Sequence, residues 1–465
     1  MIPVRGYKNS FVGVLGLGKT GLATEKALRL GGAYPLCWDD DPAKREMAKK
    51  NGVEITNLAE DSALDKANIL IVSPGIPHLY PDPHPIVARA LSKGIVIDND
   101  ISLFFRSFAS ESWNDFQTVP KVVCVTGSNG KSTTTALIEH ILGKSKIPVE
   151  MGGNFGRPVL ALKQPSEGEI KILEISSYQA ELARSLQPDI AIFINLSPDH
   201  SERHAGLGGY FSAKARLFSL GGPEKCIIGV DELEGMFLAN VMREETGTAD
   251  PVITFSTKYK LKGNSWSVFM QKNFLVEWKA DRQIGSIDLR EYSQLIGKHN
   301  YQNICAAYTC CRTLGLAPRK IQEALKDFRG LKHRSQILGK KKGVLFVNDS
   351  KATNENSAAK SLDAFDNIRW IVGGQQKEQG IENLLPPKSN VRAIYLIGSS
   401  QEKFSVCLGD IAHKKCGDLE TAVRAAFADA VPGDTILLAP ACASFDQFES
   451  FEERGNRFIQ FFNQI

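Results

Sequence analysis

The stretch Val122-Val123-Cys124-Val125-Thr126-Gly127-Ser128-Asn129-Gly130-Lys131-Ser132-Thr133 decides the fold of this chain. A run of apolar, mostly β-branched residues enters a glycine-containing turn, and the helical pattern of residues 136–142 follows. The pattern predicts a buried strand, a tight turn and a helix N-terminus. In that arrangement backbone N–H groups and the helix dipole bind phosphate oxygens.

The spacing of this motif departs from the general phosphate loop. Only two residues separate Gly127 from Gly130, where the general pattern has four between its glycines. We expect Lys131 to reach the outer phosphates and the Ser132 hydroxyl to hold Mg²⁺. The alternative is a glycine-rich turn with an exposed lysine, which the flanking strand and helix patterns disfavour.

Composition limits the class of protein. A chain of 465 residues is long enough for about three domains. Its hydrophobic content of 43% and charged content of 23% are typical of globular proteins. The net charge of +4 argues against a nucleic-acid-binding protein, so no nucleic-acid partner is expected.

The cysteines and the apolar runs indicate the compartment. There are nine cysteines with no C-x-x-C spacing, which fits a reducing cytoplasm and no structural zinc. The apolar run at residues 11–15 is too short for a signal sequence. No run approaches the ~18 apolar residues of a membrane span. We therefore expect a cytoplasmic protein without a membrane anchor.

The N-terminal region predicts a second phosphate-binding turn. A strand at residues 11–15 enters Gly16-Leu17-Gly18-Lys19-Thr20-Gly21, then a helix over 22–30 and a strand over 34–38 that ends at Asp39-Asp40. This is the dinucleotide fingerprint, and by itself it suggests an NAD-dependent dehydrogenase. Any diphosphate could bind there, with Asp39 or Asp40 accepting from a sugar hydroxyl. A strand at 68–72 adds the loop Ser73-Pro74-Gly75-Ile76-Pro77 at the same edge.

Two further strand ends lie near the first motif. The strand that begins at Lys171 carries Glu174 at its end, and the strand at residues 189–194 leads to Asp199-His200. Carboxyl ends of parallel strands meet at one sheet edge, so Ser132, Glu174 and His200 are expected to converge. Glu174 there suits Mg²⁺ or a water near a γ-phosphate.

The remaining segments complete the predicted α/β fold. Residues 251–290 read as an antiparallel edge, residues 297–303 as the cap of a helix, and 344–347, 369–372, 393–397 and 435–439 as strands of another parallel sheet. We predict three domains: an N-terminal Rossmann-like parallel sheet (1–110), a central ATPase-like, mostly parallel sheet with an antiparallel part (111–330), and a C-terminal Rossmann-like parallel sheet (331–465).

Several motifs together resemble one family. The segment Thr126 to Thr133, with its shortened spacing, is similar to the ATP loop of the muramyl (peptidoglycan precursor) ligases. Further motifs fall in the family's order: Gly153-Asn154, Glu174-Ile175-Ser176-Ser177, Asp199-His200, Ala213-Lys214 and His299-Asn300. The resemblance covers nearly the whole chain.

The closest resemblance is to the members that add D-glutamate. It rests on residues 348–354, 441–448 and 451–455. It implies that ATP phosphorylates the carboxylate of UDP-N-acetylmuramoyl-L-alanine and that the D-glutamate amine attacks the acyl phosphate. A monomer serving peptidoglycan synthesis, and so cell shape and division, is expected. The alternatives are a sister ligase adding another amino acid, the dehydrogenase above, or a nucleotide-regulated binding module without turnover.

The resemblance also implies site residues. The expected catalytic residues are Lys131, Glu174, His200 and Lys214, and the ligands of two Mg²⁺ ions are Ser132, Glu174, His200 and a carbamylated Lys214. ATP is expected to contact Gly127, Ser128, Asn129, Gly130, Lys131, Ser132, Thr133, Asn154, Asn300, Arg334 and Asp349. The UDP-sugar is expected at Gly18, Lys19, Thr20, Asp39, Asp40, Ser73 and Gly75, and D-glutamate at Thr353, Lys377, Ser444 and Phe451. Gln375-Gln376 stands where an acidic or small residue is expected before Lys377.

Overall fold

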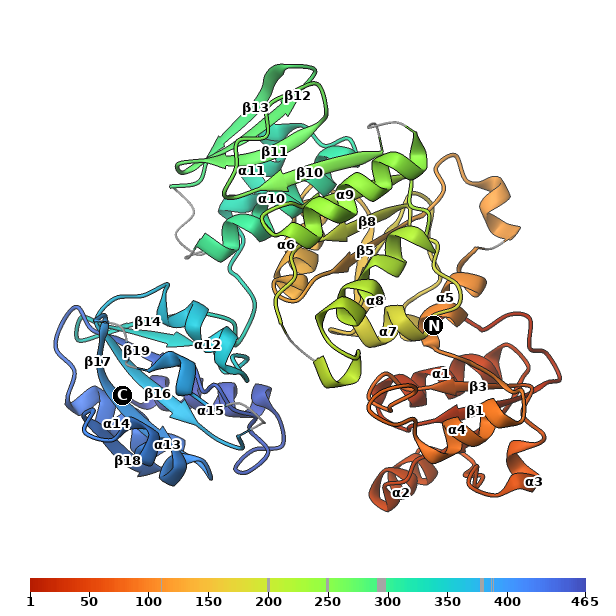
Figure 1. The fold of residues 1–465 in the computed structure, drawn as a ribbon, viewed down its shortest axis with the longest axis horizontal. Helices are drawn as coiled ribbons and strands as arrows, with labels where there is room; N and C mark the ends of the chain where they lie inside the picture. The colour runs from red at the N-terminus through yellow and green to blue at the C-terminus, as the bar shows by residue number, and fades with distance from the viewer. Residues whose placement is uncertain are drawn as a thin grey trace. The chain divides into compact units, whose positions relative to one another are not determined.

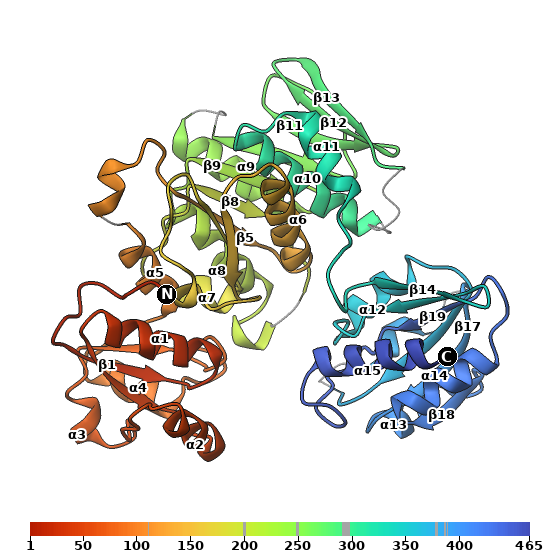
Figure 2. The same ribbon diagram turned by 180° about the vertical axis from the view of Figure 1, so that it is seen from behind.

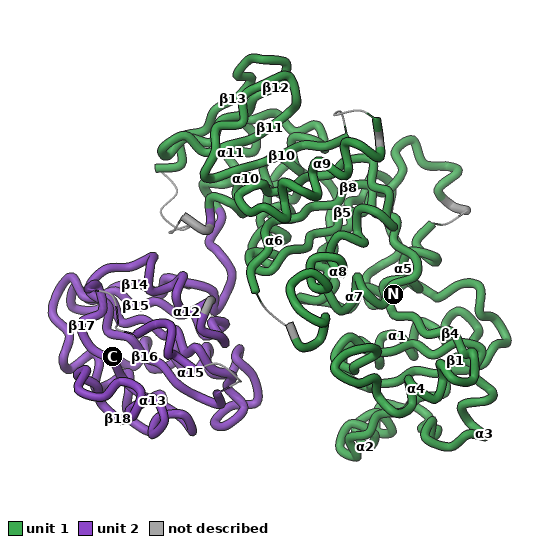
Figure 3. Tube along the Cα trace, viewed as in Figure 1, with its two compact units in different colours: residues 1–291, 301–327 green, residues 292–300, 328–465 purple. Residues whose placement is uncertain are grey.

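Three β-sheets, divided between two compact units, make up the fold. The structure is a computed structural model, and it describes residues 1–109, 111–198, 201–247, 251–290, 298–376, 380–385, 387 and 389–465. Residues 1–291 and 301–327 form the first unit, and residues 292–300 and 328–465 form the second (Figure 3). The first unit holds sheets of four and nine strands, and the second a sheet of six. The predicted three-sheet α/β class is confirmed.

The N-terminal sheet, drawn in red and orange in Figure 1, is wholly parallel, with the strand order β2-β1-β3-β4. Its strands are β1 (Phe11–Leu15), β2 (Tyr34–Trp38), β3 (Ile69–Val72) and β4 (Val96–Asp98). Its helices are α1 (Lys19–Leu30), α2 (Pro42–Lys50), α3 (Asp61–Leu64), α4 (Pro85–Ser92) and α5 (Asp100–Phe108). β1 and β3 are almost entirely apolar because helices cover both faces of the sheet. The predicted strands at 11–15 and 34–38 are confirmed.

The central sheet runs β13-β12-β11-β10-β9-β8-β5-β7-β6. Its strands are β5 (Lys121–Thr126), β6 (Val149–Gly153), β7 (Ile170–Glu174), β8 (Ile190–Phe193), β9 (Lys225–Gly229), β10 (Val252–Ser256), β11 (Ser267–Gln271), β12 (Phe274–Lys279) and β13 (Arg282–Asp288). The helices are α6 (Lys131–Lys144), α7 (Ser177–Leu182), α8 (Leu207–Ser219), α9 (Leu233–Thr246), α10 (Lys298–Thr313) and α11 (Pro318–Lys326). Helices α8 and α9 face the viewer in Figure 1, whereas α6, α10 and α11 do so in Figure 2.

The antiparallel edge of the central sheet is narrower than predicted. Among the described strands of this sheet, only the pairs β11–β12 and β12–β13 are antiparallel, and a two-residue turn at Lys272-Asn273 folds β12 back on β11. β10 pairs in parallel with both β9 and β11, so the prediction of an antiparallel edge over 251–290 is wrong for its first part. The ten residues between β10 and β11 form a crossover connection, so the two strands run in the same direction.

The C-terminal sheet has the order β14-β15-β19-β16-β17-β18. Its strands are β14 (Gln336–Lys341), β15 (Val344–Asn348), β16 (Ile368–Gly373), β17 (Val391–Ile397), β18 (His413–Gly417) and β19 (Thr435–Leu438). Its helices are α12 (Glu355–Leu362), α13 (Gln401–Leu408), α14 (Leu419–Ala428) and α15 (Phe451–Gln464). α12 and α13 pack on one face, and α14 and α15 on the other.

This sheet is mixed, whereas the sequence predicted a parallel one. β14 pairs antiparallel with β15 through the two-residue turn Lys342-Gly343, and both turn residues have positive φ angles of 48° and 79°. Two such residues make the tight hairpin turn whose twist matches the strands on either side. The Lys-Gly pair was the signal in the sequence for this hairpin.

One helix starts at a side-chain cap, and another starts earlier than predicted. Asn99 caps α5 by accepting a hydrogen bond from Ser102 N. The Asn99 side chain also donates to Gln179 O at 2.7 Å and so joins α5 to α7. Residues 297–303 were expected ahead of a helix. Gly297 lies outside the described residues, and α10 already includes residues from Lys298 onward.

None of the helices that the structure describes is both long and apolar enough to cross a membrane.

Asp100 gives a testable consequence of this packing. It lies fully buried at the start of α5, and burial raises the pKa of its carboxyl to about 7, with a smaller contribution from Asp98. The unfolded chain releases this proton near pH 4, so the free energy of unfolding falls as pH rises from about 4 to about 7. We predict that Asp100→Asn removes this loss and stabilises the protein by roughly 1–4 kcal/mol at pH 8.

Thermal unfolding of both proteins at pH 8 and pH 5 measures the effect, and the gain should be larger at pH 8. Asp61→Asn is the matched control, because Asp61 also opens a helix but has an exposed side chain. An equal gain at both pH values would contradict the proton linkage.

Candidate active site

The phosphate-loop motif forms the predicted strand, turn and helix. β5 ends at Thr126, the turn follows, and α6 begins at Lys131. Gly127 and Gly130 have φ angles of +149° and +86°, which favour glycine. A Cβ atom on Gly130 would lie 2.0 Å from Asn303 Oδ1, so α10 also requires a glycine here. The first turn of α6 presents backbone N–H groups that no helical carbonyl can pair, which is an anion site.

Two lysine ammonium groups meet at this loop. Lys131 Nζ donates to Gly127 O at 2.9 Å and to Ser128 O at 3.0 Å. Lys214 Nζ comes from α8 and donates to the same Gly127 oxygen at 3.0 Å. Lys214 is 1% exposed, and its Nζ lies 4.3 Å from the centre of the Tyr210 ring. The loop therefore combines two cations with backbone donors, an arrangement that attracts phosphate.

Ser132 and Glu174 lie together beside the loop, as the strand order predicts. Ser132 Oγ donates to Glu174 Oε2 at 2.5 Å, and both residues are 3% exposed. Asn154 Nδ2 donates to the other carboxylate oxygen at 2.9 Å. Asn154 thus contacts Glu174 directly, and its contact with ATP stays a prediction. The amide orients the carboxylate toward the serine.

These residues fit Mg²⁺. Mg²⁺ prefers hard oxygen ligands and is usually bound by one or two protein groups together with substrate phosphates and water. Ser132 and Glu174 supply a hydroxyl and a carboxylate oxygen within hydrogen-bonding distance of each other. In the described part of the chain, no group of three His, Cys, Asp or Glu residues could hold a metal ion. Asp199 and His200 lie outside the described residues.

The two candidate aspartates beside the N-terminal loop differ in burial and in their contacts. Asp39 is buried, and its carboxylate accepts from Leu17 N at 2.7 Å and from Asp41 N at 2.9 Å. Asp40 is exposed and bonds His84 Nε2 at 2.7 Å and Trp38 Nε1 at 2.9 Å. Asp39 therefore holds the loop in shape, and Asp40 is the carboxylate at the surface.

The other predicted residues of this region lie around the same loop. Gly18 caps α1, while Lys19 and Thr20 form its first turn. Ser73 Oγ donates to Gly16 O at 3.0 Å and joins the two loops. Gly75 is exposed, and its carbonyl accepts from Arg203. The predicted residues of this loop pair thus share one end of the parallel sheet.

In the second unit, the predicted residues lie on loops at the carboxyl ends of strands. Asp349 follows β15, is buried, and accepts from Ser361 Oγ. Burial raises the pKa of Asp349, while Ser361 and Arg334 oppose the rise. Thr353 lies on the same loop, and Ser444 follows β19 and is 2% exposed.

Three predicted site residues remain, and they lie in different parts of the chain. Phe451 begins α15, and its ring lies 4.0 Å from Lys351 Nζ. Asn300 is buried on the first turn of α10. Lys377 lies outside the described residues.

Sequence reasoning missed Arg454, which connects two of these loops. Arg454 is 1% exposed and donates to Ser350 Oγ, to Ser350 O at 2.9 Å, and to the carbonyls of Cys442 and Ala443. Burial lowers the pKa of its guanidinium to about 10, so it stays charged near neutral pH. The segment 451–455 that carries the resemblance includes this arginine, but its partner Ser350 lies 104 residues away.

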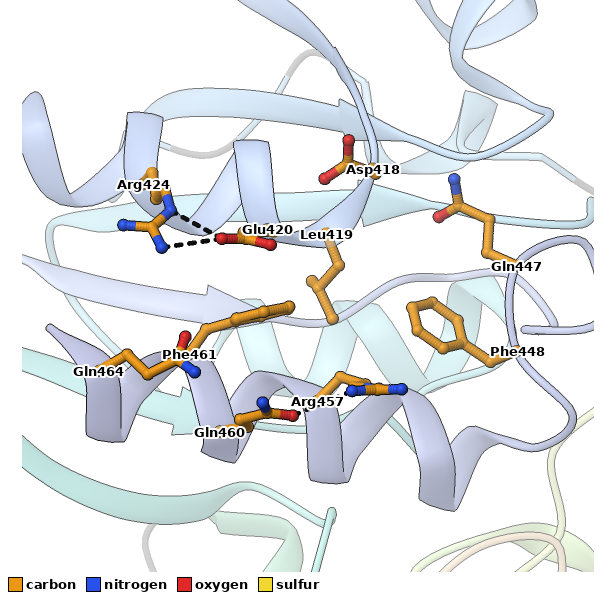
Figure 4. Close-up of a pocket in the computed structure, with 10 residues that line it drawn as sticks. All are labelled: Asp418, Leu419, Glu420, Arg424, Gln447, Phe448, Arg457, Gln460, Phe461 and Gln464. Carbon is orange, nitrogen blue, oxygen red and sulfur yellow. Dashed lines mark hydrogen bonds and ion pairs between the residues drawn. The ribbon is translucent and has the colours of Figure 1, made fainter.

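The second unit also has a polar groove, which lies apart from the predicted site residues on these loops. It lies between α14 and α15 and has a volume of about 820 Å³ (Figure 4). Leu419, Phe448 and Phe461 form its apolar part, and Arg424 pairs with Glu420 at its side. Charges of both signs line it, and no predicted site residue does.

Two protein-family models match this chain, and they match two successive parts of it. The Mur ligase middle domain matches residues 125–311, and the Mur ligase, glutamate ligase domain matches residues 333–442.

Two relatives match over nearly their whole length. A UDP-N-acetylmuramoylalanine–D-glutamate ligase of Cereibacter sphaeroides (strain KD131) is 55% identical over 460 residues, which cover 99% of both chains. The protein of the same name from Dinoroseobacter shibae is 54% identical over 459 residues, covering 99% of this chain and 98% of its own. Among solved structures, a UDP-N-acetylmuramate-alanine ligase from Thermotoga maritima has a TM-score of 0.59 at 16% identity, covering 98% of this chain and 99% of its own. That likeness concerns the fold alone.

The contact between Asn154 and Glu174 can be tested through metal binding. We predict that Asn154→Ala leaves the carboxylate free to turn and weakens Mn²⁺ binding, used as a probe for Mg²⁺, by about tenfold. The loss of the free Mn²⁺ EPR signal, in the presence of ADP, measures this affinity. Arg157→Ala is the control, because Arg157 is exposed in the same turn and pairs with Glu150. Unchanged Mn²⁺ affinity in Asn154→Ala would contradict the orienting role.

Proposed function

This chain belongs to the Mur ligase family, and we propose that it joins D-glutamate to UDP-N-acetylmuramoyl-L-alanine with ATP as the energy source. The observation that carries the proposal is the 55% identity, over 99% of both chains, to a ligase of that name. The contact of Ser132 with Glu174 beside the phosphate loop supports the use of ATP independently. The product is a precursor of peptidoglycan, and the reaction serves cell-wall growth, cell shape and division.

We assign one substrate to each of three domains, over residues 1–110, 111–330 and 331–465. The UDP-sugar binds the first domain, at the loop of residues 16–20 and the loop after β3. Asp40 contacts the uridine, since the Asp39 carboxylate already accepts from Leu17 N and Asp41 N. ATP binds the central domain, and D-glutamate binds the third.

The nucleotide is held by charge and by backbone donors. Lys131 leaves its present contacts with the loop carbonyls and cradles the β- and γ-phosphates. Asn300, Arg334 and Asp349 contact the rest of the nucleotide. Mg²⁺, when bound, neutralises phosphate charge, and Ser132 and Glu174 would hold it, with His200 and a carbamylated Lys214 available for a second ion.

The reaction proceeds in two steps. A carboxylate oxygen of UDP-N-acetylmuramoyl-L-alanine attacks the γ-phosphorus of ATP, the bond to the β,γ-bridging oxygen breaks, and an acyl phosphate and ADP result. The neutral amine of D-glutamate then attacks the acyl carbon, and phosphate leaves with the amide formed. Both steps depend on alignment and charge neutralisation more than on a protein nucleophile.

D-glutamate is held in the third domain by four predicted residues. Lys377 pairs with a carboxylate by charge, and Ser444 and Thr353 donate hydrogen bonds. Phe451 packs beside them at the start of α15. The buried Arg454 supports the loops that carry Ser444 and Thr353, since it bonds Ser350 and Cys442 together.

The enzyme acts in the cytoplasm as a monomer. The absence of C-x-x-C spacing in a chain with nine cysteines fits a reducing compartment. All nine cysteines are free thiols.

Substrate choice is the direct test. We predict that phosphate release from ATP, with UDP-N-acetylmuramoyl-L-alanine present, requires D-glutamate and is at least tenfold slower with L-alanine or a diamino acid. Lys131→Ala should abolish turnover while circular dichroism and melting temperature stay unchanged, because Lys131 is on the surface of the loop and not in the core. Faster release with a diamino acid would identify a sister ligase. Release by Lys131→Ala at the wild-type rate would contradict the phosphate-loop mechanism.

The carbamate on Lys214 has its own test. A carbamate converts a buried ammonium into an oxygen ligand, which explains a lysine next to a metal site. We predict that Lys214→Ala loses at least 100-fold in kcat, and that short carboxylates such as acetate or formate restore part of it by occupying the vacated space. Lys225→Ala, in a nearby strand with a less buried lysine, should be unaffected. A folded Lys214→Ala variant that no carboxylate rescues would count against the carbamate.

A further inference from the structure

Two consecutive backbone amides of the phosphate loop are held by one residue. Ser128 N donates to Asn195 O at 3.0 Å, and Asn129 N donates to Asn195 Oδ1 at 3.0 Å. Asn195 follows β8, the strand next to β5, and is 8% exposed. These amides anchor the loop, and the amides of the first turn of α6 remain for phosphate oxygens. The position of the anchoring amide therefore sets the shape of the anion site.

The Asn195 side chain is in turn held by α10. Asn195 Nδ2 donates to Gln302 Oε1 at 2.7 Å, and Gln302 Nε2 donates to Asp231 Oδ2 at 3.0 Å. The chain of contacts thus runs from Asp231, after β9, through two amides to the loop at Asn129. All four residues belong to the first unit.

Asp231 sets the direction of donation along this chain of hydrogen bonds, the Asp231–Gln302–Asn195–Asn129 relay. Its carboxylate can only accept, and it also accepts from Ser256 Oγ, Thr257 and Lys258 N. Gln302 must therefore point its NH₂ at Asp231 and its oxygen at Asn195. Asn195 must then point its NH₂ at Gln302 and its oxygen at the Asn129 N–H. A flip of either amide would set donor against donor or acceptor against acceptor.

We propose that Gln302 is a positioning residue for the ATP phosphates, acting through Asn195 on the phosphate loop. The inference rests on the proposed function only for the identity of the nucleotide. Gln302 lies on the same helix as Asn303, which packs against Gly130 at the other end of the loop. α10 therefore holds the loop at both ends, by contact at Gly130 and by the relay at Asn129.

Removing the relay should weaken nucleotide binding specifically. Gln302→Met keeps the length of the side chain and loses both hydrogen bonds. We expect the Kd of a non-hydrolysable ATP analogue with Mg²⁺, measured by calorimetry, to rise about tenfold, and the KM for ATP to rise with it. The KM for D-glutamate should stay within twofold. Thr313→Val is the control, because Thr313 lies at the far end of α10 and its hydroxyl donates within the helix to Thr309 O.

The direction of the relay is tested by a double variant. Gln302→Glu alone sets two carboxylates against each other and should weaken binding at least as much as Gln302→Met. Gln302→Glu with Asp231→Asn lets the new amide at position 231 donate to the new carboxylate at position 302 with the same total charge, while the Thr257 hydroxyl, which donates to the same Asp231 oxygen, turns to accept. It should bind the analogue within about threefold of wild type.

The outcomes separate this inference from the proposed function. Wild-type protein that fails to bind the analogue would refute the nucleotide site itself. If wild type binds and Gln302→Met binds equally well, or if the double variant is as weak as Gln302→Glu, the positioning role is wrong. A rise in every KM together with a lower melting temperature would show a merely structural role and also overturn it.

Discussion

The hydrogen bond from Ser132 to Glu174 is the interaction on which the candidate site depends. Ser132 lies on the first turn of α6, and Glu174 is the last residue of β7. The bond therefore joins two strand–loop units at one edge of the central sheet, with 2.5 Å between buried oxygens. Asn154 occupies the second carboxylate oxygen, so Glu174 faces the phosphate loop in one orientation. Without this contact, the phosphate loop would bind an anion but would have no carboxylate beside it.

The order of the strands explains why distant residues meet. β6, β7, β5 and β8 are consecutive neighbours in the sheet and all run parallel. Their carboxyl ends bring Asn154, Glu174, the phosphate loop and Asn195 to one edge, which is where open α/β sheets bind ligands. Each of these residues lies at the end of its strand or within two residues of it, so a short loop is enough to aim it. The chemistry is thus set by strand adjacency more than by long, adaptable loops.

Prediction from the sequence succeeded for the elements whose structure is determined by neighbouring residues in the chain. The apolar runs and glycine turns sufficed for β1, β5, β7 and the start of α6, and parallel strand ends implied the meeting of Ser132 with Glu174. The antiparallel β14 was missed because a Lys-Gly turn is a weak signal beside four parallel strands. The roles of Gln302 and Arg454 could not be predicted, because Gln302 bonds Asn195 at a separation of 107 residues and Arg454 bonds Ser350 at a separation of 104 residues, and such contacts follow only from packing. Lys214 was identified through a resemblance and not from its helix, where it reads as a solvated residue.

A buried charge in the second unit shows how loops are fixed before substrates arrive. Arg454 is 1% exposed, and it donates to backbone carbonyls and to the Ser350 hydroxyl. Burying a cation against neutral groups costs free energy that an ion pair would offset more fully. What this burial provides is a fixed loop geometry, because one guanidinium holds the loops after β15 and β19 together, and those strands are neighbours. Ser350 and Cys442 are therefore fixed to each other at the end of the sheet, which lowers the entropy that a ligand of these loops would have to overcome.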